Sequence, residues 1–253
     1  MVVAHRGASS NWPENTLPAF AAATKIGVVM QEFDVRSTRD DVLVCVHDAT
    51  LDRTTDAALR LGPGAAVAQA RREEVAGLDA GRWFGPEHAG TRIPTLGQAL
   101  DVMLPNCIPM IEHKAGSVRL YLDELRQHDA LHRCVLQSFD WKFVAEARAS
   151  APDLATALLG PSHDFPRLDR AVLAAAEHIG AGMLHWNDRQ VHLVEIEQVH
   201  VRGLLLCTYT TDDEVGWFGG AALGIDAMCT NAPERMIELR GTGALRRSGP
   251  AAQ

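Results

Sequence analysis

The sequence has no run of about 18 apolar residues, so no segment of it is predicted to cross a membrane as a helix. It also lacks an excess of positive charge, because 24 Lys and Arg stand against 32 Asp and Glu, which gives a formal net charge of −8. That balance disfavours a surface that binds nucleic acid or anionic lipid. We therefore expect no nucleic-acid partner and no stable membrane association, and an anionic substrate would have to be bound by a few placed cations.

Cysteine is sparse and odd in number, with five residues that lie mostly within apolar runs such as LVCVHD and LLLCTY. Such positions are typical of small reduced core residues, so no disulfide framework is predicted. The first predicted strand begins at Val2, which leaves no room for a signal or transit segment. The sequence therefore predicts a cytoplasmic protein.

A regular alternation of short and long segments runs through the 253 residues, 47% of which are hydrophobic. Short β-rich runs alternate with amphipathic, helix-like stretches, an order typical of parallel βαβ units. We count eight such strands: VVAH, VVMQEFDV, CIPMIEHK, RCVLQSF, LATALLG, GMLHWN, LLLCTY and DAMCT. Eight strands in a chain of this length favour an α/β fold of the (β/α)8 or TIM-barrel type over a doubly wound sheet.

One segment interrupts this alternation. After the second strand comes another strand-like run, VLVCVHD, followed by a polar stretch that contains glycine. We predict a barrel domain over residues 1–240, with 49–92 as a small insertion after the second strand. The tail, 241–253, has few large apolar residues and is predicted to be disordered.

Ionisable residues gather where the predicted strands end. In a TIM barrel the chemistry is expected at the carboxyl ends of the strands. Residues of this kind end the first three strands and the run after the second: His5, Arg6, Glu32, Asp34, His47, Glu112 and Lys114. Perturbed titratable groups cluster at functional sites, so the set as a whole indicates an active site.

Each of these residues also has an ordinary structural interpretation. A strand-end histidine such as His5 is, by itself, more often a hydrogen-bonded structural residue, and Lys114 could simply be the salt-bridge partner of Glu112. Glu32 and Asp34 could form a solvated edge, but they lie within an apolar run, where unpaired charges are costly. Side chains two apart in a strand share a face, so this pair could instead hold a cation.

Seven segments, in order along the chain, resemble the glycerophosphodiester phosphodiesterases of the bacterial cytosolic type. They are HRGASSNWPENTLPAF, EFDVRSTRDDVLVCVHDATLDRTTD, LDAGRWF, IPTL, IEHK, QSFD and YTTDDE…LGIDAMCTNAPE. The resemblance runs from His5 to about Arg235. It implies a TIM barrel with a small insertion after the second strand. It also implies hydrolysis of glycerophosphodiesters to glycerol 3-phosphate and an alcohol.

The resemblance also implies roles for the strand-end residues. The implied metal ligands are Glu32, Asp34 and Glu112; the implied acid/base histidines are His5 and His47; Arg6 and Lys114 take the phosphate-contacting places. Three carboxylates form a hard oxygen site suited to a divalent cation, for which we expect Mg²⁺ in a cytoplasm, with Ca²⁺ as the alternative. The sequence leaves open which histidine is the acid and which the base.

Three positions depart from the usual family pattern. Asp41 stands where glycine is common, Asn231 where aspartate is usual, and Tyr209 where tryptophan is common. They leave substrate preference open. Two alternatives also stay open: a phosphodiesterase that acts on lysophospholipid or phosphoinositide, which would need an apolar entrance, and a barrel that binds phosphodiesters without catalysis, which the presence of both histidines disfavours.

Overall fold

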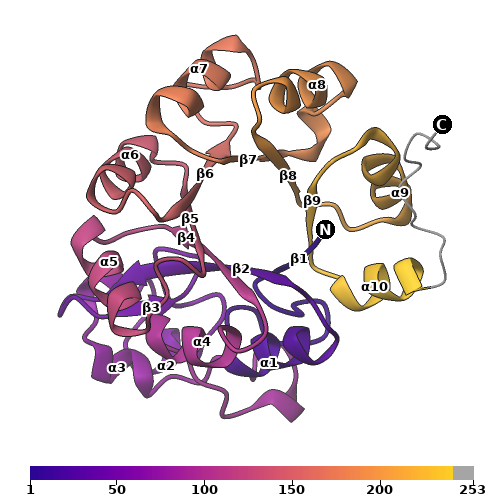
Figure 1. The fold of residues 1–253 in the computed structure, drawn as a ribbon. Coiled ribbons are helices and arrows are strands. Elements are labelled where there is room, and N and C mark those ends of the chain that lie inside the picture. The colour runs from indigo at the N-terminus through magenta and orange to yellow at the C-terminus, as the bar shows by residue number, and fades with distance from the viewer. Residues whose placement is uncertain (242–253) are drawn as a thin grey trace.

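The barrel is closed. The computed structural model describes residues 1–241, and within them β9 pairs with β1, and β1 with β2, to complete the ring (Figure 1). Eight parallel strands form it: β1 (Val2–His5), β2 (Met30–Ser37), β4 (Ile108–His113), β5 (Val135–Ser138), β6 (Ala155–Gly160), β7 (Met183–Asn187), β8 (Leu205–Tyr209) and β9 (Ala227–Thr230). The predicted TIM barrel is confirmed.

Helices surround the strands on the outside (Figure 1). Those of the outer ring are α1 (Leu17–Lys25), α4 (Leu96–Met103), α5 (Val118–Gln127), α6 (Trp141–Ser150), α7 (Arg170–Ile179), α8 (Leu193–Val201), α9 (Glu214–Leu223) and α10 (Pro233–Gly241), with a 3-10 turn, η3 (Asp188–Gln190), after β7. Their apolar faces pack on the strands; in α5, for example, Tyr121, Leu122 and Leu125 are buried. None of the helices described is both long and apolar enough to cross a membrane.

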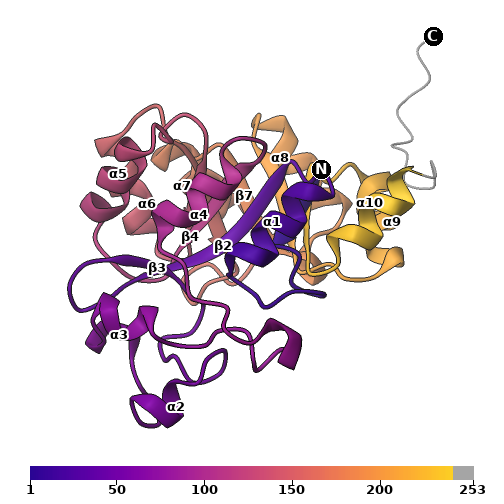
Figure 2. The same cartoon turned by 90° about the horizontal axis from the view of Figure 1, so that it is seen from below.

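The chain between β2 and α4 leaves the barrel. The strand β3 (Leu43–Cys45) pairs antiparallel with the end of β2. The elements after it are α2 (Ala57–Arg60), η1 (Val67–Gln69), α3 (Arg72–Ala76) and η2 (Pro86–His88). Figure 2 shows α2 and α3 beyond the end of the barrel at which β2 terminates. Buried residues of this segment, among them Leu51, Val67 and Leu78, pack into a core of their own.

The predicted domain limits stay a prediction. The predicted disorder of 241–253 falls, apart from residue 241, outside the described residues.

The turn that connects β2 to β3 contains the first departure from the family pattern. Asp41 has φ +61°, a left-handed conformation that glycine adopts most easily and that Asp and Asn tolerate better than other residues. Its N–H donates to the carbonyl oxygen of Thr38 at 3.1 Å. The tight turn therefore forms without glycine and leads the chain back along β2.

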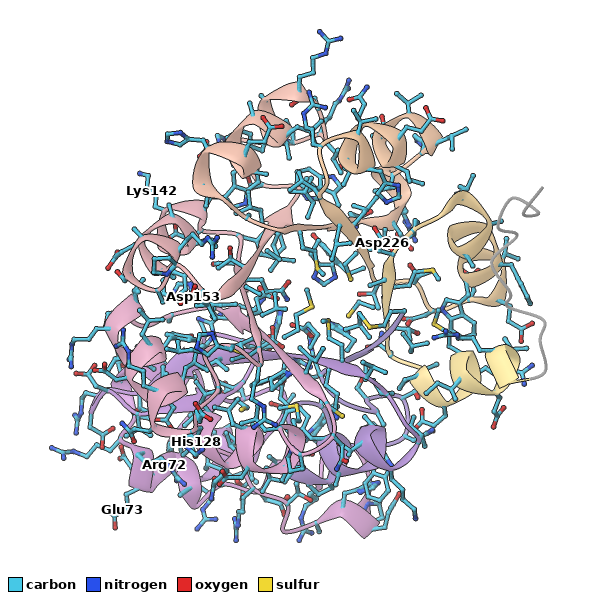
Figure 3. All side chains as sticks on the ribbon, in the orientation of Figure 1. Arg72, Glu73, His128, Lys142, Asp153 and Asp226 are labelled. Atoms are coloured by element: carbon cyan, nitrogen blue, oxygen red, sulfur yellow. The ribbon has the colours of Figure 1, made fainter. Side chains whose placement is uncertain are left out.

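Side chains fill the centre of the barrel in layers. Several of those seen there carry sulfur, shown yellow in Figure 3, and the apolar cluster includes Met30, Met110, Met183 and Cys207. In contrast, the labelled Arg72 and Glu73 of α3 lie at the periphery. Nearer the carboxyl ends of the strands the inward positions become polar: His5 is paired in register with Glu32, and Asp34 with Glu112. The interior of the barrel is therefore apolar at its centre and polar near the carboxyl ends of the strands.

Candidate active site

Three carboxylates form the centre of this polar layer. Glu32 and Asp34 share one face of β2, and Glu112 lies opposite Asp34 on β4. One oxygen from each lies within 4.8 Å of those from the other two, and all three residues are buried. Neither carboxylate oxygen of Glu32 has a hydrogen-bond partner within residues 1–241. A buried carboxylate without donors needs a positive charge or a proton, so the donor set fits a divalent cation.

The carboxylates influence one another strongly. Burial, followed by repulsion from Asp34 and Glu112, raises the pKa of Glu32 well above its usual range. Burial and then repulsion from Asp34 raise the pKa of Glu112 to about 7. Burial would also raise the pKa of Asp34, but Arg6 and Lys114 outweigh it and bring that pKa down to about 2. Without a cation, therefore, Asp34 carries the negative charge most readily and the other two tend to hold protons.

Two basic side chains lie against the trio. Arg6 places Nε 3.1 Å from Asp34 Oδ2 and donates from Nη1 to Glu14 Oε1 at 2.9 Å. Lys114 places Nζ 3.3 Å from Asp34 Oδ1 and also contacts Glu112 Oε1. Both side chains are largely buried, so their charges are poorly screened by solvent. The site thus combines cations for a phosphate with carboxylates for a metal ion.

His5 ends β1 just before a sharp turn. Gly7 has φ +83°, and a Cβ there would lie 2.7 Å from the carbonyl carbon of Ala19, so glycine is required at this close approach to α1. The His5 Nδ1 atom is 2.7 Å from Asn231 Oδ1, and Nε2 is 3.8 Å from Glu32 Oε2. Burial, assisted by the nearby Arg6, lowers the pKa of His5. The ring is therefore neutral at neutral pH.

His47 follows β3 and is held by a chain of ion pairs. Its Nδ1 lies 2.6 Å from Asp48 Oδ1, and Asp48 accepts from Arg53 Nε at 2.6 Å. Arg53 also donates from both terminal nitrogens to Glu14, at 2.7 and 3.0 Å. Since Glu14 in turn binds Arg6, charged contacts connect His47 to the end of β1. The hydrogen bond to Arg53 is the main cause that holds the pKa of Asp48 below its usual range.

A sequence model of the glycerophosphoryl diester phosphodiesterase family matches residues 5–235, which include all the site residues described above. The chain belongs to this family. Over 253 aligned residues this chain is 32% identical to a glycerophosphodiester phosphodiesterase of Caldanaerobacter subterraneus subsp. tengcongensis. The alignment covers 94% of this chain and 97% of that relative.

Solved structures agree with this assignment. This chain superimposes with a TM-score of 0.86 and 25% identity on an Oleispira antarctica phosphodiesterase solved in complex with the product sn-glycerol-3-phosphate. The superposition covers 95% of this chain and 96% of that one. A glycerophosphodiester phosphodiesterase from Agrobacterium tumefaciens gives a TM-score of 0.81 at 26% identity, covering 94% and 98%. The resemblance inferred from the sequence motifs is confirmed, and the chain is an enzyme of this class.

Seven site residues were candidates from the sequence. In the structure, direct contacts bring six of them together. His5 lies beside Glu32, while Arg6 and Lys114 lie beside the other two carboxylates. The seventh, His47, joins them through a chain of charged contacts from Asp48 to Arg53 and on to Glu14, which binds Arg6. His113, between Glu112 and Lys114 in sequence, lies on the other face of the strand and stacks on Phe143.

Some functional contacts of the phosphodiesterase were not foreseen. Asn15 lies just before α1, and its side chain donates to Asp34 Oδ2 at 2.9 Å and accepts from the Asp34 N–H at 3.2 Å. The N-cap of α1 is Thr16, whose hydroxyl bonds to Pro13 rather than capping the helix. The PENT motif could have indicated the roles of Glu14 and Asn15, because its polar residues follow the strand-end His-Arg directly.

Proposed function

We propose that the chain hydrolyses glycerophosphodiesters to glycerol 3-phosphate and an alcohol, with a divalent cation and a pair of histidines. The observation that carries the proposal is the buried Glu32 carboxylate, with both oxygens lacking donors, beside two further carboxylates and two fixed cations. The product named for the Oleispira antarctica structure, sn-glycerol-3-phosphate, supports the choice of substrate class.

The cation would be held by Glu32, Asp34 and Glu112, and we propose Mg²⁺, with Ca²⁺ as the alternative. When bound, the cation supplies positive charge against a non-bridging phosphate oxygen. Arg6 and Lys114 would share the two non-bridging oxygens with it. Because charge accumulates on these oxygens during displacement, such contacts strengthen in the transition state, and this lowers the barrier.

The two histidines would move the protons. Hydrolysis adds water to phosphorus and breaks the P–O bond to the alcohol, so the attacking oxygen loses a proton and the departing oxygen gains one. We assign the acceptor role to His5, because burial lowers its pKa and so favours the neutral ring, in which one nitrogen is free to accept a proton. His47 is then the donor to the departing alkoxide, with Asp48 and Arg53 holding its ring in place.

The experiment that tests this proposal measures which products form from a panel of diesters. We expect glycerophosphocholine and glycerophosphoethanolamine to release glycerol 3-phosphate, detected with a coupled dehydrogenase assay, together with the free alcohol. Lysophosphatidylcholine and phosphatidylinositol belong in the panel, because faster turnover of either would favour the lysophospholipid or phosphoinositide alternative. Release of free glycerol and a phosphorylated head group would contradict the proposed bond cleavage, and no turnover of any diester would contradict the proposal as a whole.

A further inference from the structure

Asn231, one of the three departures from the family pattern, lies beside His5. It follows β9 directly, and its side chain contacts three groups: His5, Asp212 and Ser9, whose hydroxyl donates to Asn231 Oδ1 at 3.0 Å. Its Oδ1 is 2.7 Å from His5 Nδ1, and its Nδ2 donates to Asp212 Oδ2 at 2.7 Å. The other oxygen of Asp212 accepts from the Asn231 backbone N–H at 2.8 Å and from the Thr230 hydroxyl at 3.0 Å. Three donors therefore hold the Asp212 carboxylate in one orientation.

This arrangement fixes the orientation of the Asn231 amide. An ionised carboxylate can only accept hydrogen bonds, so the amide NH₂ has to face Asp212. The reverse orientation would bring the amide oxygen against the carboxylate, with two acceptors 2.7 Å apart. The amide oxygen is consequently directed at His5, and because it too can only accept, His5 Nδ1 must carry the hydrogen of that bond.

We infer that Asn231, oriented by Asp212, is a positioning residue that keeps the neutral His5 ring in the tautomer with its hydrogen on Nδ1. The lone pair is then on Nε2, the nitrogen directed towards Glu32 and the phosphate site. The tautomer of a histidine is set by the hydrogen bond at its other nitrogen. The consequence for the rate rests on the proposed function, in which His5 Nε2 accepts a proton.

The pairing with Asp212 also explains why an amide suits this position. A carboxylate at 231 would lie against the carboxylate of Asp212, at the distance now bridged by an N–H donor. Like charges so close are unfavourable unless one of them is protonated. With asparagine, the charge stays on Asp212, farther from His5, and the group that touches His5 is neutral.

The test is the tautomer of His5, observed by NMR of the protein labelled with ¹⁵N-histidine, with Mg²⁺ present and at about pH 8, above the ordinary histidine pKa. The pyrrole-like and pyridine-like nitrogens of a neutral ring have well separated shifts. The His5→Gln variant identifies the His5 signals among those of the 11 histidines. In the unmodified enzyme we expect the hydrogen on Nδ1. In Asn231→Leu and in Asp212→Asn we expect a large share of it on Nε2.

In the same variants kcat should fall by between about tenfold and 10⁴-fold, while KM changes little. Loss of a hydrogen-bond partner behind a reacting group, or a wrong histidine tautomer, lowers activity by factors in this range. Exchanging the two groups, Asn231→Asp together with Asp212→Asn, recreates the donor and acceptor pattern. It should return the hydrogen to Nδ1 and recover most of the kcat lost in Asp212→Asn.

The matched control is Asp213→Asn, which makes the same charge change one residue away, at a side chain that caps α9. It should leave tautomer and kcat unchanged.

A His5 hydrogen that stays on Nδ1 in both Asn231→Leu and Asp212→Asn would overturn the inference, whatever their activity. A tautomer that changes while kcat does not would overturn its link to catalysis. Failure of the proposed function is distinguishable from both, because the tautomer is read without turnover, whereas that failure is a lack of glycerol 3-phosphate release by the unmodified enzyme.

Discussion

Glu32→Gln is expected to lower kcat by about three orders of magnitude or more, because it would remove a charged ligand from the proposed cation that stabilises the transition state. The substitution keeps the size and shape of the side chain. It also replaces a buried carboxylate whose two oxygens lack donors with a neutral amide. The fold of the metal-free protein should therefore be retained, with a melting temperature equal to or above that of the unmodified chain.

The comparison requires kcat, far-UV circular dichroism and melting temperature for both proteins in the presence of a chelator and of Mg²⁺. The matched control is Glu146→Gln, which makes the same chemical change on the exposed side of α6 and should affect none of these quantities. Retained activity in Glu32→Gln would contradict the proposed ligand set. A large drop in melting temperature would instead indicate that Glu32 is needed for folding.

Alanine substitutions at the two histidines should separate their roles. Without the proton donor, a choline ester should react about 10²- to 10⁴-fold more slowly, because an aliphatic alkoxide leaves poorly unless it is protonated. A glycerophosphoryl p-nitrophenyl ester has a good leaving group and needs no such donor. We therefore expect His47→Ala to recover much of its rate on the activated ester, and His5→Ala to be equally impaired on both substrates.

The measurement is the ratio of kcat/KM for the two esters in each variant, with the unmodified enzyme as reference. A recovery seen in His5→Ala instead of His47→Ala would exchange the assigned roles. Equal losses for both variants on both esters would contradict a divided acid/base mechanism and indicate that the histidines mainly bind phosphate.

The fold was predictable because the hydrophobic pattern is local. Each strand of the barrel appears in the sequence as a short β-rich run. Glu32, Asp34 and Glu112 are the carboxylates near the ends of two of these runs, and the two-residue spacing of Glu32 and Asp34 predicts that they share a face. The strand ends then supplied the other four candidate residues, because TIM barrels carry their polar groups there.

The contacts that orient these residues were not predictable in the same way, because they join distant parts of the chain. His5 and Asn231 are separated by 226 positions, and Glu14 and Arg53 by 39. No local periodicity connects such pairs, and Arg53 taken alone could be an ordinary surface charge. The contact of Asn15 with Asp34 has a similar cause: near a helix start an asparagine usually caps, and only the proximity of β2 gives it Asp34 instead.

The account rests on a cation bound by three buried carboxylates, and calorimetric titration of the metal-free protein with Mg²⁺ tests this most directly. Because burial raises the pKa of Glu112 to about 7 and that of Glu32 well above its usual range, binding near pH 7 should displace protons, seen as heats that depend on the ionisation enthalpy of the buffer. The apparent affinity should rise as the pH rises, since fewer protons then compete. We predict one Mg²⁺ per chain, with proton release, and loss of both in Glu32→Gln. The absence of binding to the unmodified protein, or unchanged binding in Glu32→Gln, would contradict the account.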